Sequence, residues 1–422
     1  MTVFEKIEAT SCDCDRVVDA LASVREALDA ALALAAPVAE TEIVPLHAAR
    51  GRVLAEPVTA GADMPRFDNS GMDGYALRHA DLRGDEWLSV VGTCAAGDEM
   101  TDLPPGVAMR IYTGAPVPRG ADTVVMQESV ARTAKGIRPV SLTARGANIR
   151  KRGSDRHAGD AMLPRGTVLG AKAVAVCAGA GAGHVAVYRR PRVALLLTGD
   201  EVTPTGAPLQ AGAIWDVNGP MLAALCHDAG VALVDKRTVP DTRAALSAHL
   251  SDLVGRVDMI VTSGGVSVGD RDHVSGALHD IEAEIAVAGV AIKPGKPVTV
   301  ARRDGCLILG LPGNPVSAFV TWHVLGRPVA SRLSGRRDTG VTSRHVRASA
   351  PLSHKPGRCE YRPARILGYD GDGHQVIGCA DRMRSADLGP LIDADGLILL
   401  PAEVERVQQG DLLEFLPFNG TD

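Results

Sequence analysis

Apolar and polar residues alternate along this chain with two different periods, and the period changes from one region to the next. Between Asp15 and Ala36 the apolar residues recur at helical spacing, which predicts an amphipathic helix. From residue 60 to 150 short apolar stretches are separated by Gly and Pro turns, a pattern typical of a small all-β unit. The stretch that follows, to about residue 188, predicts one Ala-rich helix between strand-like segments.

From residue 189 the chain alternates between buried strands and helices. The segments "PRVALLLTGDEV", "ALVDKRTVPD" and "VDMIVTSGG" read as strands. Helices are predicted from Pro220, with Asn218 as its cap, and over "TRAALSAHLSDLV". This alternation predicts a central parallel or mixed sheet with helices on both faces. After residue 336 short strands return, which predicts a small β-barrel or sandwich.

These patterns predict a multidomain α/β plus β protein. Its parts are an N-terminal helix (residues 15–40) that packs on the α/β domain, a small linking α+β domain (41–59 and 151–188), an inserted β domain (60–150), the α/β domain (189–336) and a C-terminal β-barrel domain (337–422).

The net charge, the cysteines and the N-terminal sequence argue against several classes of protein. The 422 residues carry a formal net charge of -5, which argues against a general binder of nucleic acid. Eight cysteines are scattered, and the CxC of Cys12 and Cys14 lacks matching ligands at zinc spacing, so free thiols in a reducing compartment are expected. The N-terminus does not resemble a signal peptide, and no apolar run suits a membrane span. A cytoplasmic protein is expected.

Three predicted strands end in polar, glycine-rich turns: "TGDE" (Thr198 to Glu201), "TSGGVSVGDRD" (Thr262 to Asp272) and "GLPGNPVSAF" (Gly310 to Phe319). In an open parallel sheet, ligands bind beyond the carboxyl ends of the strands. Glycines let the backbone approach a ligand, hydroxyls donate to it, and a helix that starts after such a turn can receive an anion. The candidate residues are Ser263, Gly264, Gly265, Ser267, Pro312, Asn314 and Pro315.

Two lysines in "AIKPGKPVTV" lie between these turns. Lys293 and Lys296 flank a Pro–Gly turn that can aim both ammonium groups at one spot, which suits a phosphate or an oxyanion such as molybdate. The alternative is an ordinary connection with solvated lysines. The chain has no GxxxxGK[ST] or GxGxxG motif, so the turns together, and none alone, favour a phosphate-bearing ligand.

Several carboxylates are also expected at strand ends. Carboxylates beside a phosphate indicate a Mg²⁺ bridge, because hard oxygen ligands hold this ion. Solvated loop acids are the alternative. The candidates are Asp200, Glu201, Asp241, Asp270 and Asp272.

A second polar cluster lies in the predicted inserted domain. "MPRFDNSGMDGYAL", "RIYTGAPVPRGADTVVMQE" and "GANIRKRGSD" are dense in Gly, Pro and charge. By themselves these residues predict only polar functional loops.

Together with the strand-end turns, these motifs resemble the molybdopterin molybdenumtransferase family, which includes the C-terminal domain of gephyrin. The likeness runs from about residue 15 to the end. It implies an enzyme that binds adenylylated molybdopterin and molybdate, cleaves the phosphoanhydride with Mg²⁺, and releases AMP and molybdenum cofactor. It further implies a homodimer with the active site between the α/β domain of one subunit and the small β domain of the other. The resemblance implies transient contacts with the adenylyltransferase and with molybdoenzymes. It implies no binding to nucleic acid or to a membrane.

The resemblance also assigns roles. The catalytic candidates are Asp73, Thr113, Asp155, Glu201, Asp241 and Asp272, of which Glu201, Asp241 and Asp272 would hold Mg²⁺. The substrate-binding candidates are the turn residues above with Lys293, Lys296, Ser317 and Arg358, the last four of which would bind molybdate.

The chain departs from the family pattern at two places. A pair of serines usual in the last domain is replaced by Gly389–Pro390, with Ser385 nearby, which puts a hydroxyl contact to molybdate from this domain in doubt. The common "DSN" reads "DVN" at Asp216 to Asn218. Other functions weighed are a molybdopterin adenylyltransferase, which does not need residues 60–150 or the β-tail, a non-catalytic scaffold, and a tungsten-inserting variant, which the sequence does not separate from a molybdenum enzyme.

Overall fold

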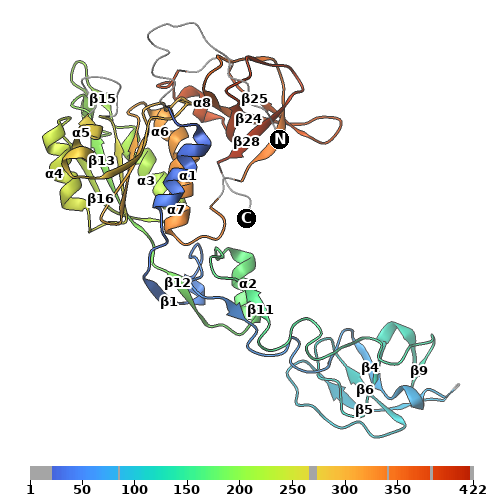
Figure 1. The fold of residues 1–422 in the computed structure, drawn as a ribbon. Coiled ribbons are helices and arrows are strands. Elements are labelled where there is room, and N and C mark those ends of the chain that lie inside the picture. Colours follow the sequence, from blue (N-terminus) through green and yellow to red (C-terminus); the bar gives the residue numbers. More distant parts are fainter. Residues whose placement is uncertain (1–20, 84–85, 266–272, 340–341, 381–383, 419–422) are drawn as a thin grey trace, which may run out of the picture.

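The computed structural model describes residues 21–83, 86–265, 273–339, 342–380 and 384–418. The molecule is elongated (Figure 1). A six-stranded sheet with its helices and a barrel lie at one end, and a lobe that contains strands β4 (Gly74–Leu77) to β9 (Gly136–Pro139) lies at the other.

The six-stranded sheet has the order β16-β13-β17-β21-β20-β18. Its parallel strands are β13 (Arg192–Thr198), β16 (Ala232–Val239), β17 (Met259–Ser263) and β21 (Cys306–Leu311). Strands β20 (Thr299–Arg303) and β18 (Glu284–Ala288) run antiparallel to their neighbours. Only Asp304 and Gly305 separate β20 from β21, and so short a turn allows a hairpin but no crossover helix. The sheet is therefore mixed.

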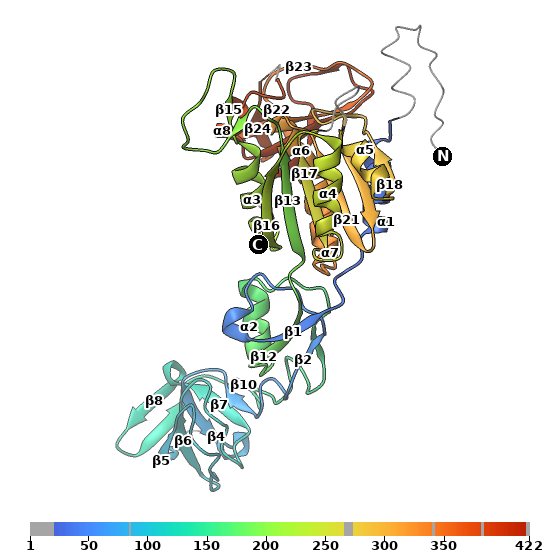
Figure 2. The same ribbon diagram turned by 90° about the vertical axis from the view of Figure 1, so that its left-hand side faces the viewer.

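Helices cover both faces of this sheet (Figures 1 and 2). One face carries α1 (Val24–Leu34), α3 (Asn218–Asp228), α6 (Pro315–Thr321), the π-helical turn η5 (Trp322–Gly326) and α7 (Arg327–Leu333); the other carries α4 (Arg243–Leu253) and α5 (His273–Asp280). Strand β13 shows the period of two that this burial requires. Its odd-numbered residues from Val193 to Leu197 belong to the first hydrophobic cluster, whereas Ala194 and Leu196 belong to the second.

The first helix starts later than its apolar pattern predicts. It begins at Val24, because Ser23 caps it: the Glu26 N–H donates to the Ser23 hydroxyl, and the Glu26 carboxylate accepts from the Ser23 N–H. The predicted helix over residues 21–23 is wrong, and the part of it before residue 21 lies outside the described residues. Ala27 and Ala31 bury the helix against the sheet.

Residues from two distant stretches build the connection between sheet and lobe. Strand β1 (Thr41–Pro45) pairs with β12 (His184–Tyr188), and β2 (Val58–Thr59) pairs with β11 (Ala161–Leu163). The Ala-rich helix α2 (Ala171–Gly179) lies between β11 and β12, as the pattern predicts, and η2 (Leu46–Ala48) follows β1.

The lobe is built from short strands. Its elements are β3 (Asn69–Ser70), η3 (His79–Asp81), β5 (Ser89–Cys94), β6 (Val107–Ile111), β7 (Thr123–Met126), η4 (Gln127–Ser129), β8 (Val130–Thr133) and β10 (Ile149–Arg150), in addition to β4 and β9. Gly74 is required here, because a Cβ at this position would collide with the Val125 carbonyl. Within the described part of residues 60–150 there is no α-helix, which agrees with the predicted all-β unit.

The last part of the chain forms a closed barrel. Its elements are β22 (Arg344–Ala348), β23 (Leu352–Ser353), β24 (Cys359–Tyr369), β25 (Gln375–Gly378), α8 (Gly389–Ile392), β26 (Gly396–Leu400), β27 (Arg406–Val407) and β28 (Leu412–Pro417). Strand β24 pairs with β25 and with β26, so the order β24-β25-β22-β28-β26 returns to β24. This closure decides between barrel and sandwich. The short β19 (Ile292–Lys293) lies between β18 and β20 in the sequence, and it pairs in parallel with the barrel strand β24.

The predicted fold class is confirmed by this arrangement, whereas the predicted domain limits stay predictions. Among the described residues no helix has the length and apolar character that a membrane crossing needs. No disulfide joins the six described cysteines, and four of them are buried; Cys12 and Cys14 lie outside the described residues.

Candidate functional site

The four parallel strands end at one edge of the sheet. Asp241 follows β16, Asp200 and Glu201 follow β13, Gly264 and Gly265 follow β17, and Pro312 follows β21. A small arm, β14 (Val202–Thr203) paired with β15 (Ile214–Trp215), continues from β13. Parallel pairing therefore puts the described parts of these polar turns at one edge of the sheet, whereas their use as a binding site stays a prediction.

The two glycines after β17 serve the packing of neighbouring turns. Gly264 has φ +94, and a Cβ there would lie 2.6 Å from the Thr198 carbonyl oxygen. Gly265 has φ +65, and a Cβ there would lie 3.2 Å from Asp241 Oδ1. Because positive φ favours glycine, both positions need it. The prediction explained these glycines by approach to a ligand; the described contacts are with the turns after β13 and β16.

Asn218 joins the turns instead of capping a helix. It is the first residue of α3, and its side-chain amide donates to Ser263 Oγ at 2.8 Å and to the Gly313 carbonyl at 2.7 Å. The predicted cap is therefore wrong. The acceptor at this helix start is Asp216, whose Oδ1 receives the Gly219 N–H at 2.7 Å. Asn218 ties the ends of β17 and β21 together.

Several buried oxygens at this edge have no hydrogen-bond partner in the described part of the chain. They are Thr198 Oγ1, Asn218 Oδ1, Asp241 Oδ1 and Thr262 Oγ1. Unpartnered buried polar atoms are costly unless something binds them. Asp200 and Glu201 are exposed beside them, and the Asp241 N–H donates to Asp200 Oδ1 at 3.4 Å. The predicted candidates Ser267, Asp270 and Asp272 lie outside the described residues.

The lysine turn joins the end of β18 to the start of β20, which puts it at the same edge of the sheet, and it packs against α6. Gly295, between the two lysines, packs so closely on Thr321 that a Cβ would collide with its methyl group. Lys293 Nζ lies 3.1 Å from Glu360 Oε1, while no ion pair of Lys296 is found among the described residues. Arg358, half-buried, precedes Cys359, whose N–H donates to the Ala291 carbonyl at 3.0 Å. The predicted lysines and Arg358 are thus on adjoining segments.

The start of α6 has fewer free backbone N–H groups for an anion than the sequence predicts. Asn314 precedes the helix and Pro315 is its first residue, as expected, but the Val316 N–H donates to the Ser385 carbonyl and the Ala318 N–H to the Asn314 carbonyl. Ser317 is buried at this end. An anion here would therefore depend more on lysine charge than on free amides.

Ser385 brings a hydroxyl of the barrel part to this place. Its Oγ accepts a hydrogen bond from Asn314 Nδ2 at 2.9 Å. Gly389 and Pro390, which replace the usual serines, instead begin the exposed helix α8. From the sequence, Ser385 is notable only because it lies near Gly389–Pro390, and the contact of Ser385 with Asn314 is not predicted.

Glu360 is a buried carboxylate with three partner side chains. Arg362 Nε donates to Oε1 at 2.9 Å, and His354 Nδ1 donates to Oε2 at 2.8 Å, in addition to Lys293. Burial alone would raise the pKa of Glu360, but the hydrogen bonds from Arg362 and His354, the Arg362 charge and the bond from Lys293 lower it from 4.5 to about 2.

This low pKa predicts acid sensitivity. A carboxylate whose pKa is lower in the folded state stabilises the fold above pH 4.5, and this contribution is lost as the pH falls towards 2. We expect Glu360 to contribute about 3 kcal/mol to the free energy of unfolding at pH 5. Urea unfolding of wild type and Glu360→Gln from pH 6 down to about pH 3 measures it. The stability gap between the two proteins should narrow as the pH falls; a constant gap would contradict the assignment.

The second predicted cluster forms in the lobe. Asp73 Oδ1 accepts from the Thr113 N–H and from the Thr113 hydroxyl, both at 2.8 Å. These two bonds lower the pKa of Asp73. The exposed Asp155 is not part of this pair; its N–H donates to the Met64 carbonyl.

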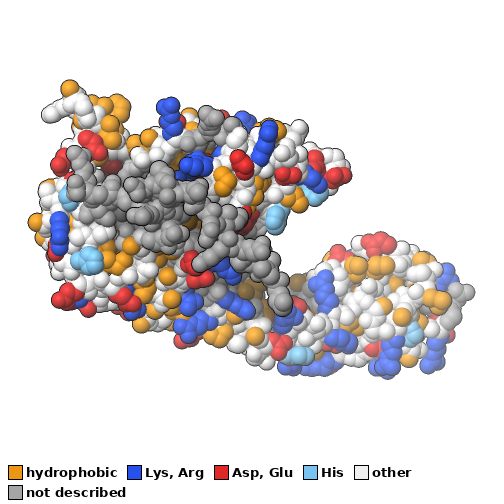
Figure 3. All heavy atoms as spheres, turned by 45° about the horizontal axis from the view of Figure 1, so that its top comes forward, with side chains coloured by type: hydrophobic (Ala, Val, Ile, Leu, Met, Phe, Trp, Pro, Cys, Tyr) orange, Lys and Arg blue, Asp and Glu red, His pale blue; other side chains and the backbone are white. Residues whose placement is uncertain are grey.

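Within one chain the lobe and the sheet edge do not meet. The lobe projects away from the sheet, and an open concavity separates it from the rest of the molecule (Figures 1 and 3). Basic and acidic side chains are mixed on the face that Figure 3 shows. Asp73 and Thr113 therefore do not complete the site around Asp241 in the same subunit.

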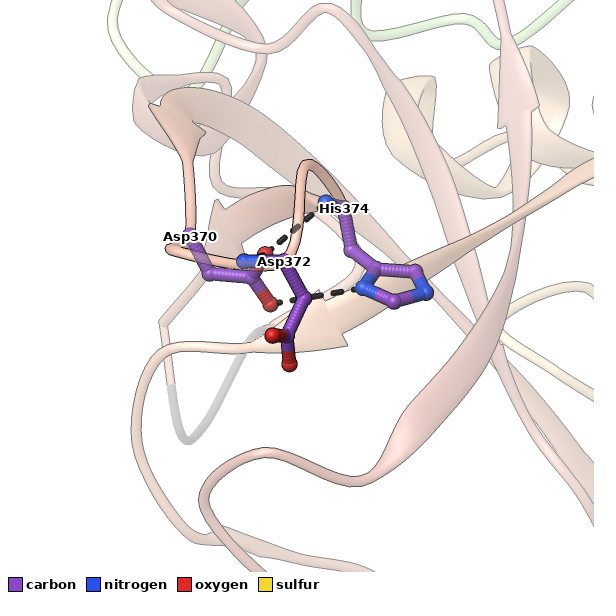
Figure 4. Close-up of side chains that lie close together, drawn as sticks. All are labelled: Asp370, Asp372 and His374. Carbon is purple, nitrogen blue, oxygen red and sulfur yellow. Dashed lines mark hydrogen bonds and ion pairs between the residues drawn. The ribbon is translucent and has the colours of Figure 1, made fainter.

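A third group of side chains was not predicted. Asp370, Asp372 and His374 lie close enough to share a metal ion, on the turn between β24 and β25 (Figure 4). Asp370 Oδ1 accepts from the Asp372 and His374 N–H groups, and Arg347 Nε lies 2.9 Å from Asp370 Oδ2. The carboxylate already has a cation and two amides, which makes this group part of the turn and not of the site described above.

Comparison with known proteins covers almost the whole chain. Three family models match it: "MoeA N-terminal region (domain I and II)" over residues 22–181, "Probable molybdopterin binding domain" over residues 194–332, and "MoeA C-terminal region (domain IV)" over residues 345–418.

Individual relatives agree with these models. The chain is 34% identical over 385 residues to the molybdopterin molybdenumtransferase of Haemophilus influenzae, a match that covers 90% of this chain and 94% of that protein. It is 41% identical over 305 residues to the enzyme of the same name from Nostoc sp., covering 70% of each. The crystal structure of the molybdopterin biosynthesis moeA protein from Pyrococcus horikoshii OT3 superposes with a TM-score of 0.79 at 26% identity, over 94% of this chain and 100% of that one.

Proposed function

The chain belongs to the molybdopterin molybdenumtransferase family, and from this premise we propose that it transfers molybdenum from molybdate to adenylylated molybdopterin and releases AMP. The observation that carries the proposal is the single sheet edge where Asp241, the glycine turn after β17 and the lysine turn all converge. A nucleotide phosphate and a tetrahedral oxyanion both need such a polar edge, with cations on one side and oxygen ligands on the other.

The acids at this edge suit Mg²⁺. Asp241 Oδ1 and Thr198 Oγ1 are buried oxygens without a partner in the described chain, and Glu201 adds a carboxylate. Oxygen donors of this kind are the ligands that Mg²⁺ prefers. We assign Glu201, Asp241 and Asp272 to its binding; the ion would neutralise phosphate charge and make AMP a better leaving group.

The lysine turn suits molybdate. Lys293 and Lys296 supply positive charge, Arg358 adds a guanidinium from the neighbouring segment, and Ser317 adds a hydroxyl at the start of α6. A tetrahedral dianion is held by such cationic and hydroxyl donors. The turn residues Ser263, Gly264, Gly265, Ser267, Pro312, Asn314 and Pro315 would line the pterin nucleotide beside it.

We further propose a homodimer in which the lobe of one subunit completes the site of the other. The separation of lobe and sheet edge within one chain supports this, since Asp73, Thr113 and Asp155 would otherwise have no substrate to act on (Figure 1). A cytoplasmic location, transient contacts with the adenylyltransferase and with molybdoenzymes, and the domain limits given above belong to the same proposal.

The test is AMP release. Purified protein given adenylylated molybdopterin, molybdate and Mg²⁺ is expected to release AMP, which chromatography quantifies. Omission of Mg²⁺ should stop the release, because the phosphoanhydride charge is then not neutralised. Folded protein that releases no AMP under any of these conditions would contradict the proposal.

A further inference from the structure

The barrel contributes a buried carboxylate to the lysine turn. Glu360 is 1% exposed and lies on β24, directly opposite Lys293 in the pairing of β19 with β24. Lys293 Nζ lies 3.1 Å from Glu360 Oε1, yet the lysine side chain is 38% exposed. One end of this ion pair is therefore inside the barrel part, and the other reaches the candidate oxyanion site.

The carboxylate itself is held from two sides. Arg362 donates to both of its oxygens, at 2.9 and 3.1 Å, and His354 Nδ1 donates to Oε2 at 2.8 Å. Because a carboxylate only accepts, the proton of the His354 ring lies on Nδ1. Arg362 is itself anchored, since its guanidinium donates to the Ser353 carbonyl. Glu360 thus has a fixed position that does not depend on Lys293.

The charges leave Lys293 able to bind an anion. One carboxylate lies between two permanent cations, Lys293 and Arg362, so the group carries a net positive charge. A free lysine side chain loses much rotamer freedom when it binds, and anchoring it in advance removes part of that cost. An anchored ammonium with uncancelled charge is what an oxyanion site requires.

We propose that Glu360 is a positioning residue for oxyanion binding: this barrel residue fixes the ammonium group of Lys293, and Lys293 in turn binds the oxyanion at the edge of the α/β sheet. This inference rests on the proposed function, in which Lys293 binds molybdate. Glu360 does not touch the substrate and acts only through the lysine.

The test is molybdate binding to the full chain, measured by isothermal titration calorimetry. Glu360→Gln keeps the size of the side chain but removes its charge, and it should raise the dissociation constant for molybdate about tenfold. His354→Ala is the matched control: it removes a contact to the other oxygen, Oε2, and should leave molybdate affinity within about twofold of wild type. Thermal unfolding of both variants reports their stability separately.

A double-mutant cycle isolates the route through the lysine. In the Lys293→Ala background, Glu360→Gln should change molybdate affinity little further, because there is no ammonium left to position. An equal tenfold loss in both backgrounds would overturn the inference, as would equal losses in Glu360→Gln and His354→Ala. If Glu360→Gln does not fold, Glu360→Asp, which keeps the charge but shortens the side chain, replaces it and should show a smaller loss; wild-type affinity in that variant would also overturn the inference.

The outcome is distinguishable from that of the proposed function. Protein that binds molybdate with this dependence on Glu360 but releases no AMP would contradict the function and leave the positioning role standing. Protein that releases AMP, but whose Glu360 variants bind molybdate like wild type, would contradict the positioning role alone.

Discussion

Asp241→Asn is expected to slow AMP release about 100-fold, which corresponds to ~3 kcal/mol of transition-state stabilisation. Asp241 follows β16, and its Oδ1 is buried without a partner in the described chain, beside Gly265. Asparagine keeps the shape but loses the charge that a magnesium ion and a phosphate need between them. A single-turnover assay of AMP release at saturating Mg²⁺ measures the change.

The fold should not suffer from this substitution. Because Asp241 Oδ1 is buried without a partner among the described residues, Asp241→Asn should leave the melting temperature unchanged or raise it slightly. Asp235→Asn is the control, on β16, the strand that precedes Asp241: Asp235 is already paired with Arg237 at 2.6 Å. It should release AMP at the wild-type rate. Wild-type turnover of Asp241→Asn would remove this residue from the site.

The α/β part is predictable from sequence because its signals are local. The period of two along β13, the polar strand ends and the strand–helix alternation each lie within a few residues. Parallel pairing then brings the ends of β13, β17 and β21 to one edge without further information. To predict that β18 and β20 run antiparallel to their neighbours, one more signal is needed, which is the short turn at Asp304 and Gly305.

The contacts that finish the site are not local, and the sequence does not reveal them. Asn218 reads as a helix cap, since Asn before an apolar run usually is one, but its partners come from Ser263 and Gly313. Glu360 and Arg362 alternate with apolar residues and so share one face of a strand, which is a signal for their pairing. Lys293 comes from the connection between β18 and β20, far from Glu360 in the sequence, and it completes the group only because β19 pairs with β24.

The catalytic roles proposed for Asp73 and Thr113 in the lobe rest on the resemblance to a family, and there is a physical reason why the sequence by itself does not predict them. Asp73 and Thr113 are forty residues apart, and their hydrogen bonds depend on the pairing of β4 with β6, which two short strands specify weakly. Even the finished pair has no described neighbour from the sheet edge. In the proposed homodimer a second subunit brings this pair to the sheet edge, and that arrangement can be tested directly.

Mixing two inactive variants should restore activity. Asp73→Asn removes the lobe's contribution and Asp241→Asn removes that of the sheet edge, so each homodimer should release AMP only slowly. In a mixed dimer with a site shared between subunits, one site carries both changes and the other carries neither. Random mixing gives half mixed dimers with one intact site of two, so roughly a quarter of wild-type AMP release should return.

The recovery distinguishes the shared site from any site within one chain. The variants are unfolded together and refolded, which mixes them randomly. Alternatively they are co-expressed with different tags and purified through both, which yields mixed dimers alone, and roughly half of wild-type AMP release per dimer is then expected. If Asp73 and Asp241 acted in the same subunit, no mixed dimer would contain an intact site and the activity would stay at the level of the separate variants. Mixing Asp241→Asn with Lys296→Ala is the matched control, because both changes fall on the same sheet edge: in a mixed dimer each site then carries one of them, and no recovery is expected.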